Sequence, residues 1–173
     1  TDTFAKAASR FGLTISIKKT EKLKQSSSNR NTGDVRINGA LLKSVDTFCY
    51  LGSMMSADAT LDAEITHRIA KASSSFGRLR KRLWNEHGVS LGTKISVYRA
   101  VVLSTLLYAS ETWTLYRHHI RKLDQFHMRC LREIARIRWQ DKVPNTEVLT
   151  RCHTTGIEAD LIRSQLRWCG HLV

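Results

Sequence analysis

The spacing of hydrophobic residues changes once along the chain, close to residue 56. Before this point apolar and polar residues alternate over short runs, as at 13–17, which is the pattern of a half-buried strand. After it, apolar residues recur every three or four positions over long stretches, which is typical of amphipathic helices. The sequence therefore predicts an α+β protein, with a short antiparallel sheet and hairpin followed by a mostly α-helical bundle.

Turn residues divide the first 56 positions. Residues 1–12 have apolar side chains at helical spacing and end on a glycine, which predicts the end of a helix. The Asn-Gly pair at 38–39 lies between two apolar runs and predicts a hairpin, because a type I′ turn needs positive φ at both positions. A further strand is predicted at 45–51, and the Ser- and Asn-rich segment 25–33 is predicted to be a flexible loop.

Three long helices and two shorter ones are predicted in the remainder. The first, at 61–83, has its apolar residues within about 80° on a helical wheel. The second, at 93–112, is apolar nearly all round and should be the most buried. The third, at 118–139, has one apolar face with arginines nearly opposite. Shorter helices are predicted near 145–152 and 156–170.

The chain of 173 residues is strongly basic. Its formal charge is +13, from 28 Lys and Arg against 15 Asp and Glu. Such an excess favours an anionic partner, most commonly nucleic acid. The alternative is a basic surface without a specific ligand.

Neither a membrane span nor a disulfide scaffold is predicted. The longest apolar segment, 95–109, is shorter than the roughly 18 to 20 residues of a membrane-spanning helix, and it contains Arg99. The four cysteines lack the spacing of a disulfide framework, which fits a reducing, intracellular setting.

Two groups of residues are candidates for metal sites. Asp58, Asp62 and Glu64 form the one acidic cluster worth testing for two-metal chemistry, but their place before a predicted helix also explains them as cap and dipole residues. A zinc site is a second possibility, at Cys152-His153 and Cys169-x-His171. Zinc ligands are usually separated by roughly two to four residues, so core cysteines and surface histidines are the favoured interpretation.

The four tryptophans lie near the ends of predicted helices. Large rings at such positions often close a core, so core packing is favoured over base stacking.

Four segments occur in a fixed order: FGLTISIKKT (11–20), FCYLGSMMS (48–56), LLYASETWTL (106–115) and RWCGHL (167–172). Together they resemble the region after the catalytic palm in reverse transcriptases of non-LTR (LINE-type) retrotransposons. In that family the metal-binding aspartates, including an aromatic-x-Asp-Asp turn, precede the Gly-Leu-x-Ile segment. This sequence contains no adjacent Asp pair, and it has Ser16 where Asn is expected.

The resemblance implies three regions. Residues 1–56 would be the C-terminal end of the palm with a primer-grip-like hairpin. Residues 57–142 would be a helical thumb-like domain, and 143–173 the start of a further helical region.

The resemblance also implies candidate nucleic-acid-binding residues. Tyr50, Leu51 and Gly52 match the aromatic-Leu-Gly turn that holds the primer 3′ end, and Lys18 and Lys19 follow a strand near the expected active-site edge. The thumb helices would contact phosphates of the duplex. Their candidate residues are Arg68, Lys71, Arg78, Arg82, Arg121, Arg129, Arg132 and Arg136. The last four fit a solvated face equally well.

The sequence is therefore interpreted as a fragment of an RNA-directed DNA polymerase that holds template–primer nucleic acid, RNA and DNA, through phosphate contacts. No catalytic residue, metal site or cofactor is assigned to it, while the parent polymerase would need Mg²⁺. The missing upstream polymerase domain is an expected partner, no membrane is expected, and the nucleus and cytoplasm are the expected location. The alternative is a stand-alone, non-enzymatic nucleic-acid-binding protein or an inactive relic of such an element.

Overall fold

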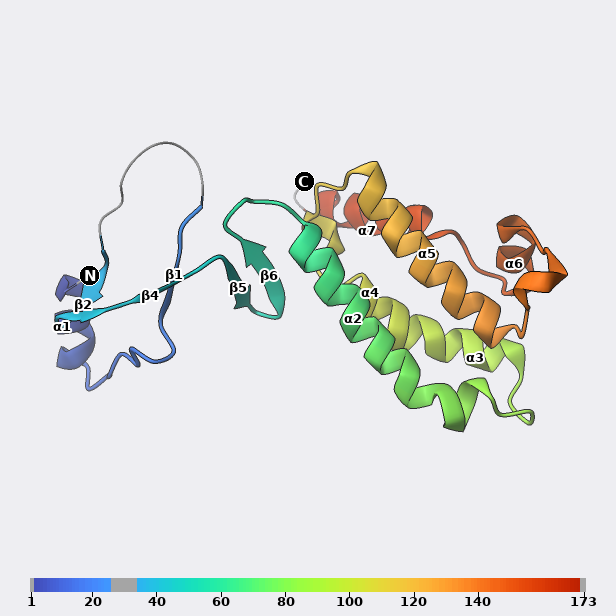
Figure 1. Ribbon diagram of the computed structural model, residues 1–173, viewed down its shortest axis with the longest axis horizontal. Helices are drawn as coiled ribbons and strands as arrows, with labels where there is room; N and C mark the ends of the chain where they lie inside the picture. The colour runs from blue at the N-terminus through green and yellow to red at the C-terminus, as the bar shows by residue number, and fades with distance from the viewer. Residues whose placement is uncertain (1, 26–33, 172–173) are drawn as a thin grey trace. The chain divides into compact units, whose positions relative to one another are not determined.

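The computed structural model describes residues 2–25 and 34–171 (Figure 1). By internal contacts the chain forms two compact units, Thr1–Ala63 and Glu64–Val173. Apart from Gln25, the loop predicted at 25–33 lies outside the described residues.

The described part of the first unit contains a helix and three two-stranded sheets. Its elements are α1 (Asp2–Arg10), β1 (Glu21–Leu23), β2 (Arg36–Ile37), β3 (Ala40–Leu41), β4 (Lys43–Val45), β5 (Thr47–Tyr50) and β6 (Ser53–Ser56). The pairs β2–β3 and β5–β6 are antiparallel hairpins, as predicted, whereas β1 and β4 pair in parallel. A small core of Ala5, Ile37 and Leu42 lies between α1 and the first hairpin.

Both hairpins turn through two residues with positive φ. Asn38 and Gly39 have φ of 51° and 80°, which confirms the predicted type I′ turn. Leu51 and Gly52 have φ of 48° and 87° and connect β5 to β6 in the same way. Glycine adopts this conformation at little cost, but a leucine there is sterically unfavourable.

The strand predicted at 13–17 is wrong. This segment has no regular structure and leads into a turn, in which the backbone N–H groups of Lys19 and Thr20 donate to the carbonyl of Ser16. The strand that forms lies beyond the turn, where β1 pairs with β4. Alternating side chains alone cannot form a strand without a partner backbone.

The second unit is helical. Its elements are α2 (Asp62–Leu79), η1 (Arg80–Trp84), α3 (Leu91–Val97), η2 (Tyr98–Leu103), α4 (Ser104–Leu106), η3 (Ser110–Thr112), α5 (Arg117–Ile134), η4 (Trp139–Asp141), α6 (Asn145–Arg151) and α7 (Ile157–Cys169), where η1 and η2 are π-helical and η3 and η4 are 3₁₀ turns. The five predicted helices are all present, and the α+β fold class is confirmed.

Two helix predictions need correction. The second helix ends at Leu106 rather than at residue 112, because Ala109 has a φ of 62°. It is also not the most buried helix, because Val101 is 41% exposed and the segment 91–106 has six buried residues, against eight in α5 (Arg117–Ile134). The third helix ends at Ile134 rather than 139, because Arg136 has a φ of 56°.

The core of the second unit is built on large rings. Trp84 stacks on Phe76 with a centroid distance of 5.1 Å, and its Nε1–H donates to the Phe76 carbonyl at 2.8 Å. The buried Lys94 ammonium donates to the carbonyls of Trp84 and Glu86 at 3.0 and 2.6 Å, which closes the end of η1. These bonds satisfy backbone carbonyls at a helix end.

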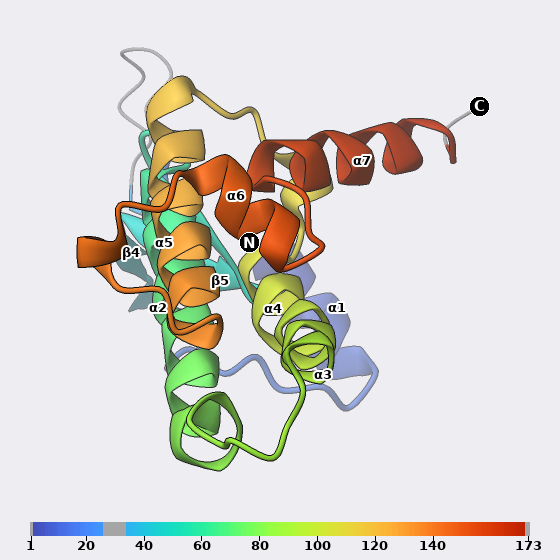
Figure 2. The ribbon, with the colours of Figure 1, turned by 90° about the vertical axis from the view of Figure 1, so that its right-hand side faces the viewer.

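Helix α5 is the centre of this unit. It lies beside α2 (Figures 1 and 2), and Glu133 of α5 forms a bidentate pair at 2.6 and 3.0 Å with Arg80, the first residue of η1 after α2. It also contacts α3, α6 and α7. The buried His127 of α5 connects three segments, because its Nδ1 bonds the Tyr98 hydroxyl at 2.8 Å and its Nε2 lies 3.3 Å from the Thr155 carbonyl.

No helix in the described ranges is long and apolar enough to cross a membrane.

Candidate nucleic-acid interface

Three predicted cations form a row along α2 and η1. Lys71, Arg78 and Arg82 are exposed at i, i+7 and i+11. Lys71 and Arg78 lie within about 20° of each other on an ideal α-helix, and Arg82 follows in the π-helical η1. Lys71 and Arg78 are separated by about 10 Å along the axis. Within the part of the chain that the structure describes, none of the three forms an ion pair. We call this row the α2 basic stripe.

The arginines predicted on the third helix divide into two kinds. Arg121 and Arg129 are exposed on α5, and the Arg129 guanidinium lies 5.3 Å from the centre of the Phe126 ring. Arg132 donates to the Val143 carbonyl and to Asn145 Oδ1, both at 2.8 Å. Arg136 donates to the Asn85 carbonyl at 2.9 Å. Arg132 and Arg136 therefore hold loops, while Arg121 and Arg129 face solvent.

Arg68 is not a surface cation, and its assignment as a phosphate contact is wrong. Its side chain is 4% exposed and its Nε donates to Glu64 Oε1 at 2.6 Å. The guanidinium also lies over the Tyr108 ring, 4.4 Å from the centroid. A buried charge requires such compensation, which Glu64 provides one helical turn earlier.

The remaining candidates lie in the first unit. Tyr50, Leu51 and Gly52 form the tip of the β5–β6 hairpin, where Tyr50 is 58% and Leu51 76% exposed. Lys18 and Lys19 are exposed in the turn that precedes β1. The first three are adjacent in one turn, and the lysines lie on a separate turn.

Two of the three candidate acidic residues, Asp58 and Glu64, are held by other partners. Asp58 Oδ1 accepts hydrogen bonds from the Ser56 hydroxyl at 2.6 Å and from the Thr60 backbone and hydroxyl at 2.9 Å. These bonds, led by that from Ser56, lower the pKa of Asp58. The Glu64 carboxylate is buried against Arg68. Asp58 therefore fixes the turn before α2, and Glu64 balances a core charge.

The two Cys/His pairs lie at opposite ends of one helix. Cys152 is buried after α6, His153 follows with a φ of 47°, and Cys169 and His171 are exposed at the end of α7. Helix α7 alone spans about 18 Å, so the pairs cannot share one ion. The core interpretation is right for Cys152 and wrong for Cys169.

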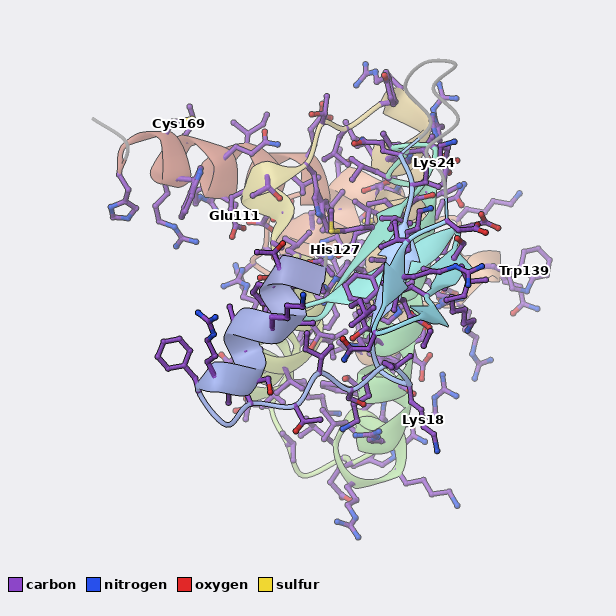
Figure 3. All side chains as sticks on the ribbon, turned by 90° about the vertical axis from the view of Figure 1, so that its left-hand side faces the viewer. Lys18, Lys24, Glu111, His127, Trp139 and Cys169 are labelled. Atoms are coloured by element: carbon purple, nitrogen blue, oxygen red, sulfur yellow. The ribbon has the colours of Figure 1, made fainter. Side chains whose placement is uncertain are left out.

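Two of the four tryptophans do not close the core. Trp84 and Trp113 are 1% and 5% exposed, as predicted, but Trp139 is 82% and Trp168 46% exposed. Figure 3 shows Trp139 projecting from the short η4 turn. Asp141 closes this turn by accepting a 2.7 Å hydrogen bond from the Arg138 backbone.

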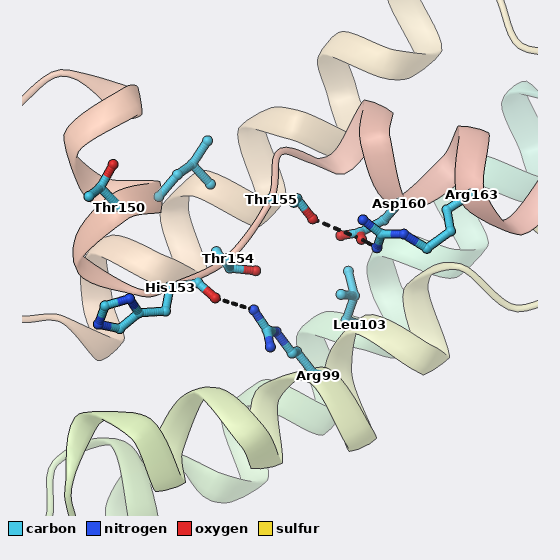
Figure 4. Close-up of a pocket in the computed structure, with 9 residues that line it drawn as sticks. Arg99, Leu103, Thr150, His153, Thr154, Thr155, Asp160 and Arg163 are labelled. Carbon is cyan, nitrogen blue, oxygen red and sulfur yellow. Dashed lines mark hydrogen bonds and ion pairs between the residues drawn. The ribbon is translucent and has the colours of Figure 1, made fainter.

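A hollow in the second unit that is lined by two arginines was not predicted. A cavity of about 730 Å³ lies between α3–η2 and the α6–α7 segment, with Arg99 and Arg163 on opposite walls (Figure 4). Arg99 donates to the His153 carbonyl. Asp160 Oδ1 accepts from Arg163 at 2.7 Å and from the Thr155 hydroxyl at 3.0 Å. The one feature of the sequence that could have indicated this hollow was a single arginine, Arg99, within the apolar run 95–109.

Comparison with known proteins identifies two similar polymerases. The chain is 24% identical over 147 residues to the RNA-directed DNA polymerase from mobile element jockey of Drosophila funebris, and 20% identical over 147 residues to that of Drosophila melanogaster. The chain is similar to LINE-type reverse transcriptases. The resemblance inferred from the four sequence segments is thereby confirmed.

The similarity to these reverse transcriptases covers 84% of this chain but 16% of the length of each relative. No protein-family model and no solved structure matches the chain.

Proposed function

We propose that this chain is the part of a LINE-type RNA-directed DNA polymerase that holds template–primer nucleic acid. The similarity to such polymerases over 84% of the chain supports this assignment, together with the formal charge of +13. The chain corresponds to 16% of its relatives' length, so polymerisation would be an activity of a longer protein.

The α2 basic stripe is the feature that carries the proposal. Lys71, Arg78 and Arg82 are exposed side chains on a helix fixed by Phe76, Trp84 and the Arg80–Glu133 pair. Cations repeated along a rigid helix can contact successive phosphates of a duplex. Such contacts position nucleic acid without reading its sequence, as a polymerase requires. Arg121 and Arg129 on the neighbouring α5 add two further exposed charges.

The β5–β6 hairpin would hold the end of the primer. The tip exposes Tyr50 and Leu51, and Gly52 lacks a side chain that would obstruct the approach of a sugar–phosphate backbone. Leu51 at positive φ is a strained residue, and strain of this kind is concentrated at functional sites. Lys18 and Lys19 would provide further phosphate contacts.

The catalytic magnesium ions would be bound elsewhere in the longer polymerase. Asp58 and Glu64 are occupied by other partners and do not fit a two-metal site. We therefore assign no catalytic step to the residues of this chain. Its proposed role is to position the nucleic acid.

The proposal can be tested by measuring binding of an RNA–DNA hybrid by fluorescence anisotropy over a range of salt concentrations. Log affinity falls with log salt by about 0.9 per neutralised phosphate. The triple variant Lys71→Gln/Arg78→Gln/Arg82→Gln should therefore lower this slope by about 2 to 3 and weaken binding.

A matched control removes three charges from the first unit. Lys6, Arg10 and Arg36 are also exposed, and their replacement by Gln changes the net charge equally. Equal loss of affinity in both triple variants would mean that only net charge matters, and the assignment of the stripe would be wrong.

A further inference from the structure

The hollow lined by Arg99 and Arg163 is separate from the α2 basic stripe. In the second unit α2 lies beside α5, whereas the hollow lies where α3 and η2 face α6 and α7 (Figures 2 and 4). We infer that this hollow binds one single strand of nucleic acid through its phosphates. The inference rests on the proposed function but concerns a different surface and a different form of the nucleic acid.

The hollow continues into two others. Cavities of about 480 and 470 Å³ adjoin it, and Arg99 lines all three. Their walls follow the helical segment from Gly92 to Leu107, a distance of about 22 Å. We call this continuous depression the trough. Its length suits an extended chain rather than a small molecule.

The charges along the trough favour phosphate groups. Four arginines line it, against the two carboxylates of Asp160 and Glu111, and one of the four, Arg151, is paired with Glu147 of its own helix. The arginines are Arg99, Arg151, Arg163 and Arg167. The hydroxyls of Thr154 and Ser164 also line the trough and can donate to phosphate oxygens, and in RNA they can also bond the 2′-hydroxyl.

The two central arginines are held in place. Arg99 is anchored through one terminal nitrogen to the His153 carbonyl, and Arg163 through Nη1 to Asp160. A guanidinium has five N–H donors, so each keeps donors for a ligand. Arg99 also belongs to the π-helical η2, and π-helical turns are frequently found at functional sites. Asp160, which binds Thr155 as well, acts here as an orienting residue.

An aromatic ring at one end of the trough favours a single strand over a duplex, because only unpaired bases are free to stack on it. Tyr108 lines one end with about half of its surface exposed. Exposed aromatic rings beside cations bind the bases of single strands by stacking. An acidic peptide would gain little from such a ring.

The test uses the full chain and a single-stranded RNA of about 16 nucleotides, the upper end of known single-strand site sizes. The variant Arg99→Gln/Arg163→Gln should weaken binding of this RNA at least about tenfold near 0.1 M salt, since each phosphate contact contributes about 0.7 to the salt slope. Binding of the RNA–DNA hybrid should change less than twofold.

A second variant avoids the anchored arginines, in case their loss disturbs the fold. Thr150→Glu places a negative charge on an exposed wall of the trough and should also weaken binding of the single strand. Thr146→Glu, on the same helix but outside the trough, is the control and should bind normally. Circular dichroism verifies that each variant is folded.

Three results would overturn the inference. The first is unchanged RNA binding in both trough variants, and the second is a loss of hybrid binding as large as the loss of RNA binding. The third is displacement of the RNA by an acidic peptide at a lower concentration than by a second RNA strand. If the α2 triple variant binds the hybrid normally while the trough variants lose the single strand, the proposed duplex interface fails and the trough stands.

Discussion

The buried pair of Glu64 and Arg68 gives the sharpest prediction for stability. Replacing Arg68 by Met keeps much of the side-chain volume but leaves the Glu64 carboxylate in the core without its cation. Both side chains are at most 4% exposed, and they are 2.6 Å apart. Removing one member of a buried ion pair costs about 3–5 kcal/mol, because the remaining charge is uncompensated.

The double variant Glu64→Leu/Arg68→Met should behave differently. Replacing a whole buried pair by apolar residues is often neutral or stabilising by about 1–4 kcal/mol, because neither charge must then be desolvated. The loss of the contact between Arg68 and Tyr108 at 4.4 Å offsets part of this gain. We therefore expect the double variant to return close to the free energy of unfolding of the parent chain.

Urea unfolding followed by tryptophan fluorescence measures these differences in the second unit, because all four tryptophans lie there. With a slope of about 1.5 kcal/mol per molar urea, the single variant should unfold about 2–3 M earlier. If Arg68→Met shifts the midpoint by less than about 0.5 M, or if the double variant is as unstable as the single, the pair does not act as described.

The same double variant tests whether Arg68 contacts nucleic acid. Because Arg68 lies in the core, the folded double variant should bind an RNA–DNA hybrid as tightly as the parent chain. A loss comparable with that of the α2 triple variant would mean that Arg68 does reach the nucleic acid.

Three further predictions concern other buried groups. Burial lowers the pKa of His127 below its ordinary 6.5, so the unfolded chain binds a proton at a higher pH than the folded chain does. The stability that depends on neutral His127 is therefore present above pH 6.5 and is lost as the pH falls below it. The variant His127→Gln should make the urea midpoint depend less on pH between pH 7 and 5. Trp84→Ala should cost about 3–5 kcal/mol, whereas Trp139→Ala should change stability by less than about 0.5 kcal/mol, as measured by urea unfolding. Burial raises the pKa of Cys130 to about 12 and also raises that of Cys152. A thiol reagent at neutral pH should therefore label the exposed Cys49 and Cys169 first. Equal labelling of all four cysteines in the native chain would contradict the structure.

The elements that the sequence predicts well are those with a strong local signal. The apolar face of α5 is continuous from Leu123 to Ile134, and these two residues are buried as expected. The Asn38-Gly39 turn needs only positive φ, which its two residues readily adopt. In both cases the preference lies within a few neighbouring residues.

The features that the sequence could not predict depend on contacts between different parts of the chain. The alternation at 13–17 gives no information on which backbone is available to pair. The burial of Arg68 could have been suspected from Glu64 at i−4 beside an apolar face, but an exposed pair has the same spacing. Arg99 and Arg163 come together only because α6 and α7 fold back towards η2, which no short segment of sequence encodes.

The π-helical segments η1 and η2 have a consequence for comparing this chain with its relatives. A π-helical turn holds about one residue more than an α-helical turn, so removing one residue there leaves the helix continuous. Removing one residue from an α-helical turn instead rotates the side chains on one side of the deletion by about 100° relative to those on the other. In an alignment, a one-residue gap is therefore structurally tolerable at 80–84 or 98–103. The same gap placed a turn away would mismatch buried and exposed positions and assign Arg82 or Arg99 to the wrong residue of a relative.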